Sequence, residues 1–242
     1  MIPGLYTAVS GMMNQQTMLE VITNNLANVN TVGYKKNELD FSGTFNPLPE
    51  QDGTYSTLNL DSVSARFITD FSEGEIRQTN STLDLALSGD GFFVIQHPEG
   101  IRYTRSGNFT LDNSGRLVTV DGYAVFGSNG AIQIQGENIE IDSKGYVIVD
   151  GNQIDKIRIV DFAKPYELTK TGHNTFNNTN QTILSSNAIV RQGYLEMSNA
   201  NPIHEMVKMI ETMRIYESYQ KTIQLFNETL EKSNNELGKI SA

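Results

Sequence analysis

The chain contains no cysteine, which excludes disulfides, thiolate nucleophiles and cysteine-based metal sites. It has no apolar run close to the roughly 20 residues that a membrane-spanning helix needs. The opening residues, Met1 to Tyr6, lack the basic segment and following apolar segment of a Sec signal peptide. The protein is therefore expected to stay in the cytoplasm or to leave the cell by another route.

Positive charge is also scarce, with 18 lysines and arginines against 28 aspartates and glutamates, for a net charge of −10. This balance argues against nucleic acid or an anionic membrane surface as a partner. Charged residues make up only 19% of the chain, which is not the composition of a highly charged disordered protein. A chain of 242 residues can bury a core, in one large or two modest domains.

Two segments at opposite ends of the chain carry apolar residues at a seven-residue spacing. The first contains Leu5, Met12, Leu19 and Leu26, with Ala8, Gln15, Ile22 and Val29 between them. The second contains Met209, Tyr216, Ile223, Leu230 and Leu237, accompanied by Tyr219 and Phe226. Such a period keeps one apolar seam facing a partner helix. The alternative is that each helix packs on its own domain. The sustained spacing favours subunit packing through both seams.

Both predicted helices carry start or stop signals. Pro3 fits a first helical turn, and Gly33 supplies a flexible stop after the asparagine-rich stretch 24–30. At the other end, Asn201 is a candidate N-cap, Pro202 suits the first helical position, and Glu205 lies near the positive end of the helix dipole.

The middle of the chain changes to a period of two from Leu83 onward, and turn signals follow at short intervals. Two segments echo each other, 109–122 and 139–151, and each is predicted to form a hairpin. The predicted fold is mixed α and β, with N- and C-terminal helices that together form a coiled-coil-like, discontinuous helical domain, and with an inserted antiparallel all-β domain. The expected divisions are 1–33 for the first helix, 34–80 for a connector with short strands, 81–196 for the β-domain and 197–242 for the last helix.

No constellation of residues indicates catalysis or metal binding. His97, His173 and His204 have no second histidine at ligand spacing. The turns starting at Asp112 and Asp142 faintly resemble calcium loops but lack the closing glutamate of an EF-hand. Dinucleotide, P-loop and Gly-x-Ser-x-Gly motifs do not occur. Scattered carboxylates could pair as in a glycosidase, but sequence does not give their separation. We therefore predict no catalytic, cofactor-binding or metal-binding residues, and no enzyme.

Several motifs resemble those of the flagellar rod and hook protein family, over nearly the whole chain and in the same order. They include the stretches 5–12, 89–94, 103–109, 115–119 and 192–199, and the positions Met206, Met209, Arg214 and Tyr216. The most specific motif consists of Asn24, Asn25, Leu26, Ala27 and Asn28, followed by Gly33 and Tyr34.

The resemblance implies a structural subunit of the flagellar basal-body rod, which acts as drive shaft and export channel. Family members pack their terminal helices into an inner tube with the β-domains outside. The implied partners are other rod subunits as axial neighbours, further copies of the chain, and the flagellar type III export apparatus. No small-molecule substrate and no cofactor is implied. The implied location is the periplasmic rod, reached without a Sec signal.

Within the family, the single middle domain and the length exclude the large multi-domain hook protein and the short rod proteins. The proximal-rod and distal-rod types remain, and two other features favour the proximal-rod type. The distal type typically carries a longer stretch after the first helix, whereas 37–60 offers only the short run Phe45 to Pro49. The segment 157–162 is also more similar to the proximal type. An alternative from another class is a secreted carbohydrate-binding or hydrolytic β-domain with oligomerisation helices.

Overall fold

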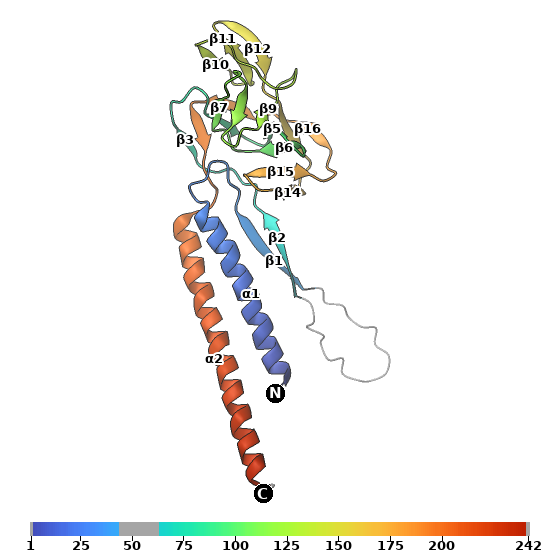
Figure 1. Ribbon diagram of the computed structural model, residues 1–242, viewed down its shortest axis with the longest axis vertical. Coiled ribbons are helices and arrows are strands. Elements are labelled where there is room, and N and C mark those ends of the chain that lie inside the picture. The colour runs from blue at the N-terminus through green and yellow to red at the C-terminus, as the bar shows by residue number, and fades with distance from the viewer. Residues whose placement is uncertain (1, 44–62, 241–242) are drawn as a thin grey trace. The chain divides into compact units, whose positions relative to one another are not determined.

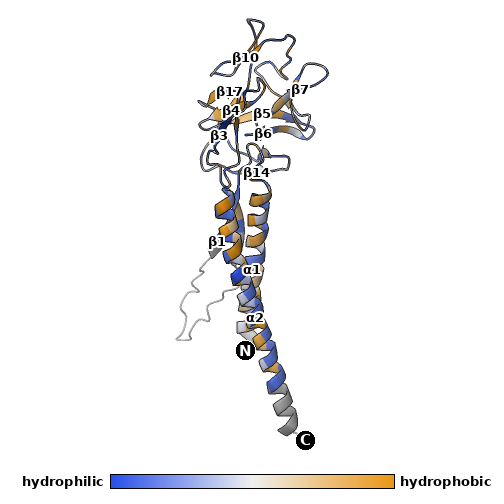
Figure 2. Cartoon of the chain, turned by 90° about the vertical axis from the view of Figure 1, so that its left-hand side faces the viewer, coloured by the Kyte–Doolittle hydropathy of each residue, from blue (hydrophilic) through white to orange (hydrophobic). Residues whose placement is uncertain are grey.

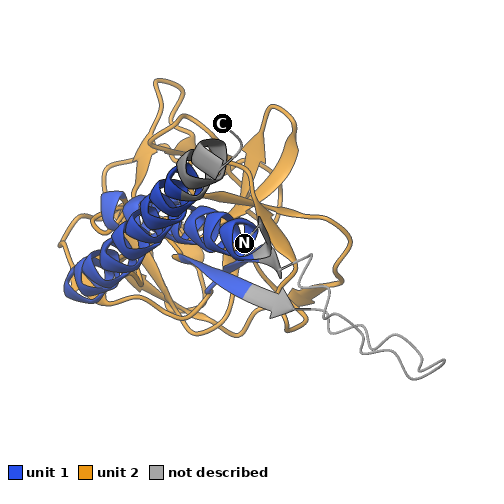
Figure 3. Ribbon diagram, turned by 90° about the horizontal axis from the view of Figure 1, so that it is seen from below, with its two compact units in different colours: residues 1–27, 37–70, 201–242 blue, residues 28–36, 71–200 orange. Residues whose placement is uncertain are grey.

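The computed structural model describes residues 2–43 and 63–240, which fall into two compact units (Figures 1 and 3). Unit 1 consists of Met1–Ala27, Asn37–Asp70 and Asn201–Ala242, and unit 2 of Asn28–Lys36 and Phe71–Ala200. The N- and C-terminal helices pack together, and an antiparallel β region is inserted between them in the sequence. The predicted mixed fold class is therefore confirmed.

Unit 1 contains the two long helices, α1 (Ile2–Ala27) and α2 (Pro202–Ile240). The predicted start of α2 is confirmed, because the Asn201 Oδ1 accepts the backbone N–H groups of Ile203 at 3.0 Å and His204 at 3.2 Å. Within the described ranges, neither helix is long and apolar enough to cross a membrane.

The helices of unit 1 contact each other in a register that repeats every seven residues. Gly4 lies against the ring of Phe226 and Gly11 against the ring of Tyr219. As the residue number rises by seven on α1, it falls by seven on α2, so the helices run antiparallel. The absence of a side chain at Gly11 matters, since a Cβ there would lie 2.6 Å from the Tyr219 Cζ.

Unit 1 also holds a two-stranded antiparallel ribbon of β1 (Asn37–Gly43) and β2 (Val63–Thr69), in which Asn37 pairs with Thr69. A two-stranded ribbon alone is marginally stable in water, and here β1 also contacts α1. The predicted connector thus contains strands. The run Phe45 to Pro49 lies outside the described residues.

Unit 2 is built from short antiparallel strands. These are β3 (Ile76–Gln78), β4 (Leu85–Ser88), β5 (Phe92–His97), β6 (Gly100–Thr104), β7 (Phe109–Leu111), β8 (Leu117–Thr119), β9 (Ala124–Val125), β10 (Ile139–Ile141), β11 (Tyr146–Val149), β12 (Asn152–Lys156), β13 (Ile159–Phe162), β14 (Leu168–Lys170), β15 (Thr175–Asn178), β16 (Ile183–Ser185), β17 (Ile189–Gln192) and β18 (Tyr194–Glu196). The main sheet has the order β14-β15-β6-β5-β9-β8-β7, and β13 joins β16 to β5.

The core of unit 2 consists of two hydrophobic clusters. The larger includes Leu85, Leu87, Phe93, Ile95, Phe109, Leu117, Val125, Ile132, Ile157 and Val190. The smaller is aromatic and includes Phe92, Tyr103, Phe162 and Phe176, joined by the half-buried Phe71 and Tyr166. Neighbouring residues of β5 contribute to opposite clusters, since Phe92 and Val94 belong to the smaller one and Phe93 and Ile95 to the larger. This follows from the alternation of side chains along a strand.

The two predicted hairpins are confirmed as β7–β8 and β10–β11. In both, an aspartate side chain closes the turn. Asp112 Oδ1 accepts the N–H groups of Ser114 and Arg116, and Asp142 Oδ1 accepts those two and four residues further on. The Arg116 backbone N–H helps to hold the pKa of Asp112 below its usual value. The calcium-loop resemblance is therefore explained by turn geometry.

We predict that Gly11→Val weakens the packing of α1 on α2, because the added methyl groups must displace the Tyr219 ring. Overpacking of this kind costs about 1–3 kcal/mol. Urea unfolding followed by the helical circular dichroism signal measures the loss. Ser10→Val, at an exposed position of the same helix, is the matched control. Equal stability of the two variants would contradict the described register.

Candidate assembly site

The asparagine motif at the end of α1 joins three segments of unit 1. The buried Asn25 donates through Nδ2 to the Asn37 carbonyl at 2.9 Å and accepts the Asn37 N–H through Oδ1, also at 2.9 Å. Its Nδ2 also lies 3.5 Å from the Glu205 carboxylate of α2. One amide side chain near the end of α1 therefore contacts both the first residue of β1 and the first turn of α2. An amide is suited to this because it carries both donor and acceptor groups.

The Gly33–Tyr34–Lys35 stretch of the motif belongs to unit 2. Gly33 has a φ of +65° and donates its N–H to the Glu196 carbonyl at 2.7 Å. A Cβ at this position would lie 2.4 Å from the Ser106 nitrogen. Both the left-handed backbone and the close approach require glycine here. Glycine is therefore required where the chain at residue 33 passes close to the backbone at Ser106.

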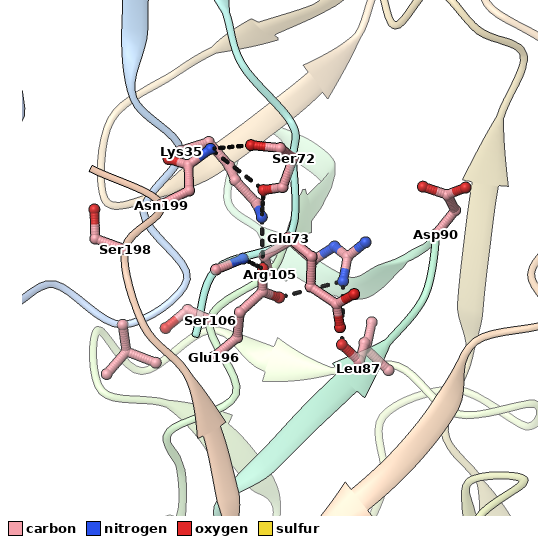
Figure 4. A network of polar contacts seen from close by, with 12 residues as sticks. Lys35, Ser72, Glu73, Leu87, Asp90, Arg105, Ser106, Glu196, Ser198 and Asn199 are labelled. Atoms are coloured by element: carbon pink, nitrogen blue, oxygen red, sulfur yellow. Dashed lines mark hydrogen bonds and ion pairs between the residues drawn. The ribbon is translucent and has the colours of Figure 1, made fainter. Parts of the chain in front are cut away.

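A buried ion cluster lies next to this crossing (Figure 4). Lys35 Nζ is 2.5 Å from Glu196 Oε1, and Arg105 Nη1 is 3.2 Å from Glu196 Oε2. The side chains of Lys35 and Glu196 are fully buried, and that of Arg105 is 3% exposed. Burial of ions is tolerated only when each is paired and hydrogen-bonded. Glu196 is the shared carboxylate that pairs with both cations.

Further hydrogen bonds tie the cluster to the backbone. Lys35 Nζ donates to the Ser72 carbonyl at 2.6 Å, and the Gly74 N–H donates to Glu196 Oε1 at 3.0 Å. The Arg105 Nη2 donates to the Gly89 carbonyl at 2.7 Å. The cluster therefore holds the segments 28–36, 71–75 and 196–200 together. These are the parts of unit 2 adjacent to unit 1 in the sequence.

Lys170 covers the same region of unit 2. Its ammonium group lies 4.4 Å from the centre of the Tyr34 ring and donates to the Lys35 carbonyl. Burial of the side chain lowers the pKa of Lys170 to about 8. The cause is loss of hydration, which disfavours the charged form.

The residues predicted to pack between subunits lie on α1 and α2. Ile22 is buried, and Leu5, Met12, Leu19, Leu26, Met209, Tyr216, Ile223 and Leu230 are half-buried. The side chain of Leu237 lies outside the described part. Because α1 and α2 contact each other, this seam is at least partly covered within one chain. Contact between these residues and neighbouring copies stays a prediction.

A second apolar row on α2 was missed by the sequence reasoning. It consists of Ile203, Met206, Val207, Ile210 and Met213, each of which is exposed. Figure 2 shows hydrophobic and hydrophilic residues along both helices. Ile203 and Ile210, like Met206 and Met213, are seven residues apart, so the spacing alone could have revealed a second seam. We call this set the α2 outer row.

A shorter exposed row lies on α1. Tyr6 is 70% exposed and Met13 62% exposed, again seven residues apart. Glu20 continues the row and is the one charged residue of α1. We call Tyr6, Met13 and Glu20 the α1 outer row. Exposed apolar side chains grouped in this way mark interaction surfaces in soluble proteins.

The histidines do not converge. His97 packs against the Tyr123 ring, His173 Nδ1 lies 3.2 Å from Asp121 Oδ1, and the His204 N–H is bonded to the cap of α2. In the ranges 2–43 and 63–240, no group of three or more acidic or histidine side chains could hold a metal ion.

Comparisons with known proteins identify the family of the chain. Models of the flagellar basal-body rod protein, the hook protein FlgE/F/G D1 domain and the basal-body rod FlgEFG C-terminal region match residues 5–35, 86–149 and 191–236. The chain is 37% identical to the flagellar basal-body rod protein FlgG of Bacillus subtilis, over 97% of this chain and 99% of that protein. The chain belongs to the flagellar basal-body rod protein family.

Other members of the rod family are similar at nearly the same level. The Borreliella burgdorferi FlgG is 34% identical over 97% of this chain and 98% of its own length. The Caulobacter vibrioides FlgF is 33% identical over 98% of both chains. The protein is thus a structural subunit of the flagellar basal-body rod, in a family that is not enzymatic. Family membership contradicts the alternative of a secreted carbohydrate-binding or hydrolytic β-domain.

We predict that Glu196→Gln destabilises unit 2 more than Lys35→Met. The first change leaves two buried cations without their carboxylate, whereas the second leaves Glu196 paired with Arg105. Breaking a buried pair costs about 3–5 kcal/mol. Urea unfolding followed by the β-sheet circular dichroism signal measures both.

The exposed pair of Lys164 and Asp90, 2.7 Å apart, supplies the control for this prediction. Lys164→Met is expected to cost no more than about 1 kcal/mol, because exposed pairs are screened by water. If Glu196→Gln were as mild as Lys164→Met, the cluster would not be holding the three segments.

Lys170 gives a pH-dependent prediction. Its folded pKa is about 8 and its ordinary value 10.5, so between these values the unfolded chain binds more protons than the folded one. Its contribution to stability therefore rises with pH across this window. Urea midpoints across the window should rise more in the parent than in Lys170→Met. Parallel pH profiles would contradict the assigned pKa.

Proposed function

We propose that this chain is a proximal-type rod subunit that polymerises through its terminal helices into a helical tube. The tube serves as drive shaft and export channel. Its partners are other rod subunits as axial neighbours and further copies of the same chain. Subunits reach the periplasmic rod through the flagellar type III export apparatus, which is supported by membership of the rod family.

The observation that carries the polymerisation proposal is the α2 outer row. Five exposed apolar side chains along three turns of one helix are costly in water, at about 25 cal/mol for each Å² of apolar surface. A rod subunit removes this cost by packing against neighbours. The outer rows then supply contacts between subunits, while the half-buried heptad residues serve contacts within and between chains.

Alignment length supports the proximal type. The FlgF relatives represent that type and the FlgG relatives the distal type. The match to the Caulobacter FlgF spans 251 positions and covers 98% of the 242 residues of this chain. About 237 of the positions are therefore occupied by residues of this chain, and about 14 face a gap in it. The match to the Bacillus FlgG spans 268 positions, of which about 235 are occupied and about 33 face a gap. Fewer positions of the match to the FlgF relative therefore lack a counterpart in this chain.

The distal type is the second candidate, favoured by the 37% identity to the Bacillus FlgG. Immunogold labelling of purified basal bodies separates the two. Label next to the export apparatus supports the proximal type, and label next to the hook supports the distal type.

We predict that Ile210→Asp blocks incorporation into the rod while both units stay folded. Ile210 is exposed in the single chain, so the charge costs little there but would be buried against a neighbour. The readouts are swarming motility and the amount of the protein in purified basal bodies, both of which should be lost.

Two matched variants test this explanation. Ile210→Leu keeps an apolar side chain and should retain motility. Val120→Asp places the same charge at an exposed apolar position of unit 2 and should be tolerated. Normal motility of the Ile210→Asp strain would refute the role of the α2 outer row.

A further inference from the structure

The two outer rows of unit 1 cannot cover each other within one chain. In the internal register, Gly11 faces Tyr219 and Gly4 faces Phe226, so the paired residue numbers add up to 230 in both cases. Tyr6 therefore lies level with about residue 224 and Met13 level with about residue 217. The α2 outer row begins at Ile203 and ends at Met213. The rows are offset along the helix axis as well as facing outward.

A shift of one chain along the axis removes the offset. Moving a second copy by 11 residues places its Tyr6 level with Met213 and its Met13 level with Met206. At 1.5 Å per helical residue, this shift is about 16 Å. Both rows have heptad spacing, so the two pairs come into register together.

We infer that the α1 outer row of one copy docks on the α2 outer row of the next copy, displaced by about 16 Å along the helix axis. The inference rests on the proposed polymerisation and names the surfaces that carry it. Each copy offers one row of each kind. The contact is therefore head-to-tail and continues as an open array.

Charges at the ends of the rows fit this displaced register. Glu20 of the second copy falls near the N-terminal end of α2, where the helix dipole favours a carboxylate. At the other end, the first turn of α1 contains no acidic residue and comes level with the exposed Glu217. Between these ends the α1 row is uncharged, which suits burial against Ile210 and its neighbours. The matching seven-residue spacing and these two helix ends support a second copy as the occupant.

Cysteine crosslinking tests the inference, because the chain has no cysteine of its own. The double variants Tyr6→Cys/Met213→Cys and Met13→Cys/Met206→Cys are expressed in place of the parent chain, and rods are treated with a mild oxidant. Each should give a ladder of covalent oligomers on a non-reducing gel. The four single variants should give at most dimers, since one thiol per chain can form only one disulfide.

The pair Tyr6→Cys/Leu225→Cys is the matched control, because Leu225 is also exposed and lies nearly level with Tyr6 in the undisplaced register. A ladder from this pair and none from the two test pairs would overturn the displacement. No ladder from the test pairs, in motile cells whose basal bodies contain the protein, would overturn the docking alone. Absence of the parent chain from basal bodies would instead overturn the proposed function.

Discussion

The seven-residue register between α1 and α2 is the constraint on which unit 1 depends. Gly4 and Gly11 admit the rings of Phe226 and Tyr219, and one of the two seams of α2 is thereby occupied inside the chain. Fixing that seam determines which side chains remain outside. The helix pair buries one apolar face of α2 within the chain and leaves another exposed. The exposed face is therefore available for contact with other chains.

In unit 2, the carboxylate of Glu196 is the group on which the packing of the crossing segments depends. It lies just before the chain returns to α2, and its partner Lys35 lies just after the chain has left α1. Such buried ion pairs add little net stability compared with apolar packing, but removal of one member strongly destabilises the fold because the other charge stays buried without its partner. They therefore specify one geometry for the crossing segments.

Much of the fold could be predicted from the sequence because its signals are local. The heptads, the Asn201 cap and the Asp-closed hairpins each depend on residues within a few positions of one another. The ion cluster could not be predicted, since Lys35 and Glu196 are 161 residues apart and nothing in their local sequence pairs them. The α2 outer row was overlooked for another reason. Its seven-residue spacing is visible in the sequence, but two such rows overlap on α2. Spacing alone does not tell which of the two rows α1 covers within the chain.

We propose that the outward rows of the two terminal helices face neighbouring rod subunits. A cryo-electron microscopy map of the intact basal body tests this most directly. We expect this chain to occupy the rod, with Ile210 and Met13 buried against helices of adjacent subunits. A map in which the chain lies in the rod but both side chains face water would contradict it.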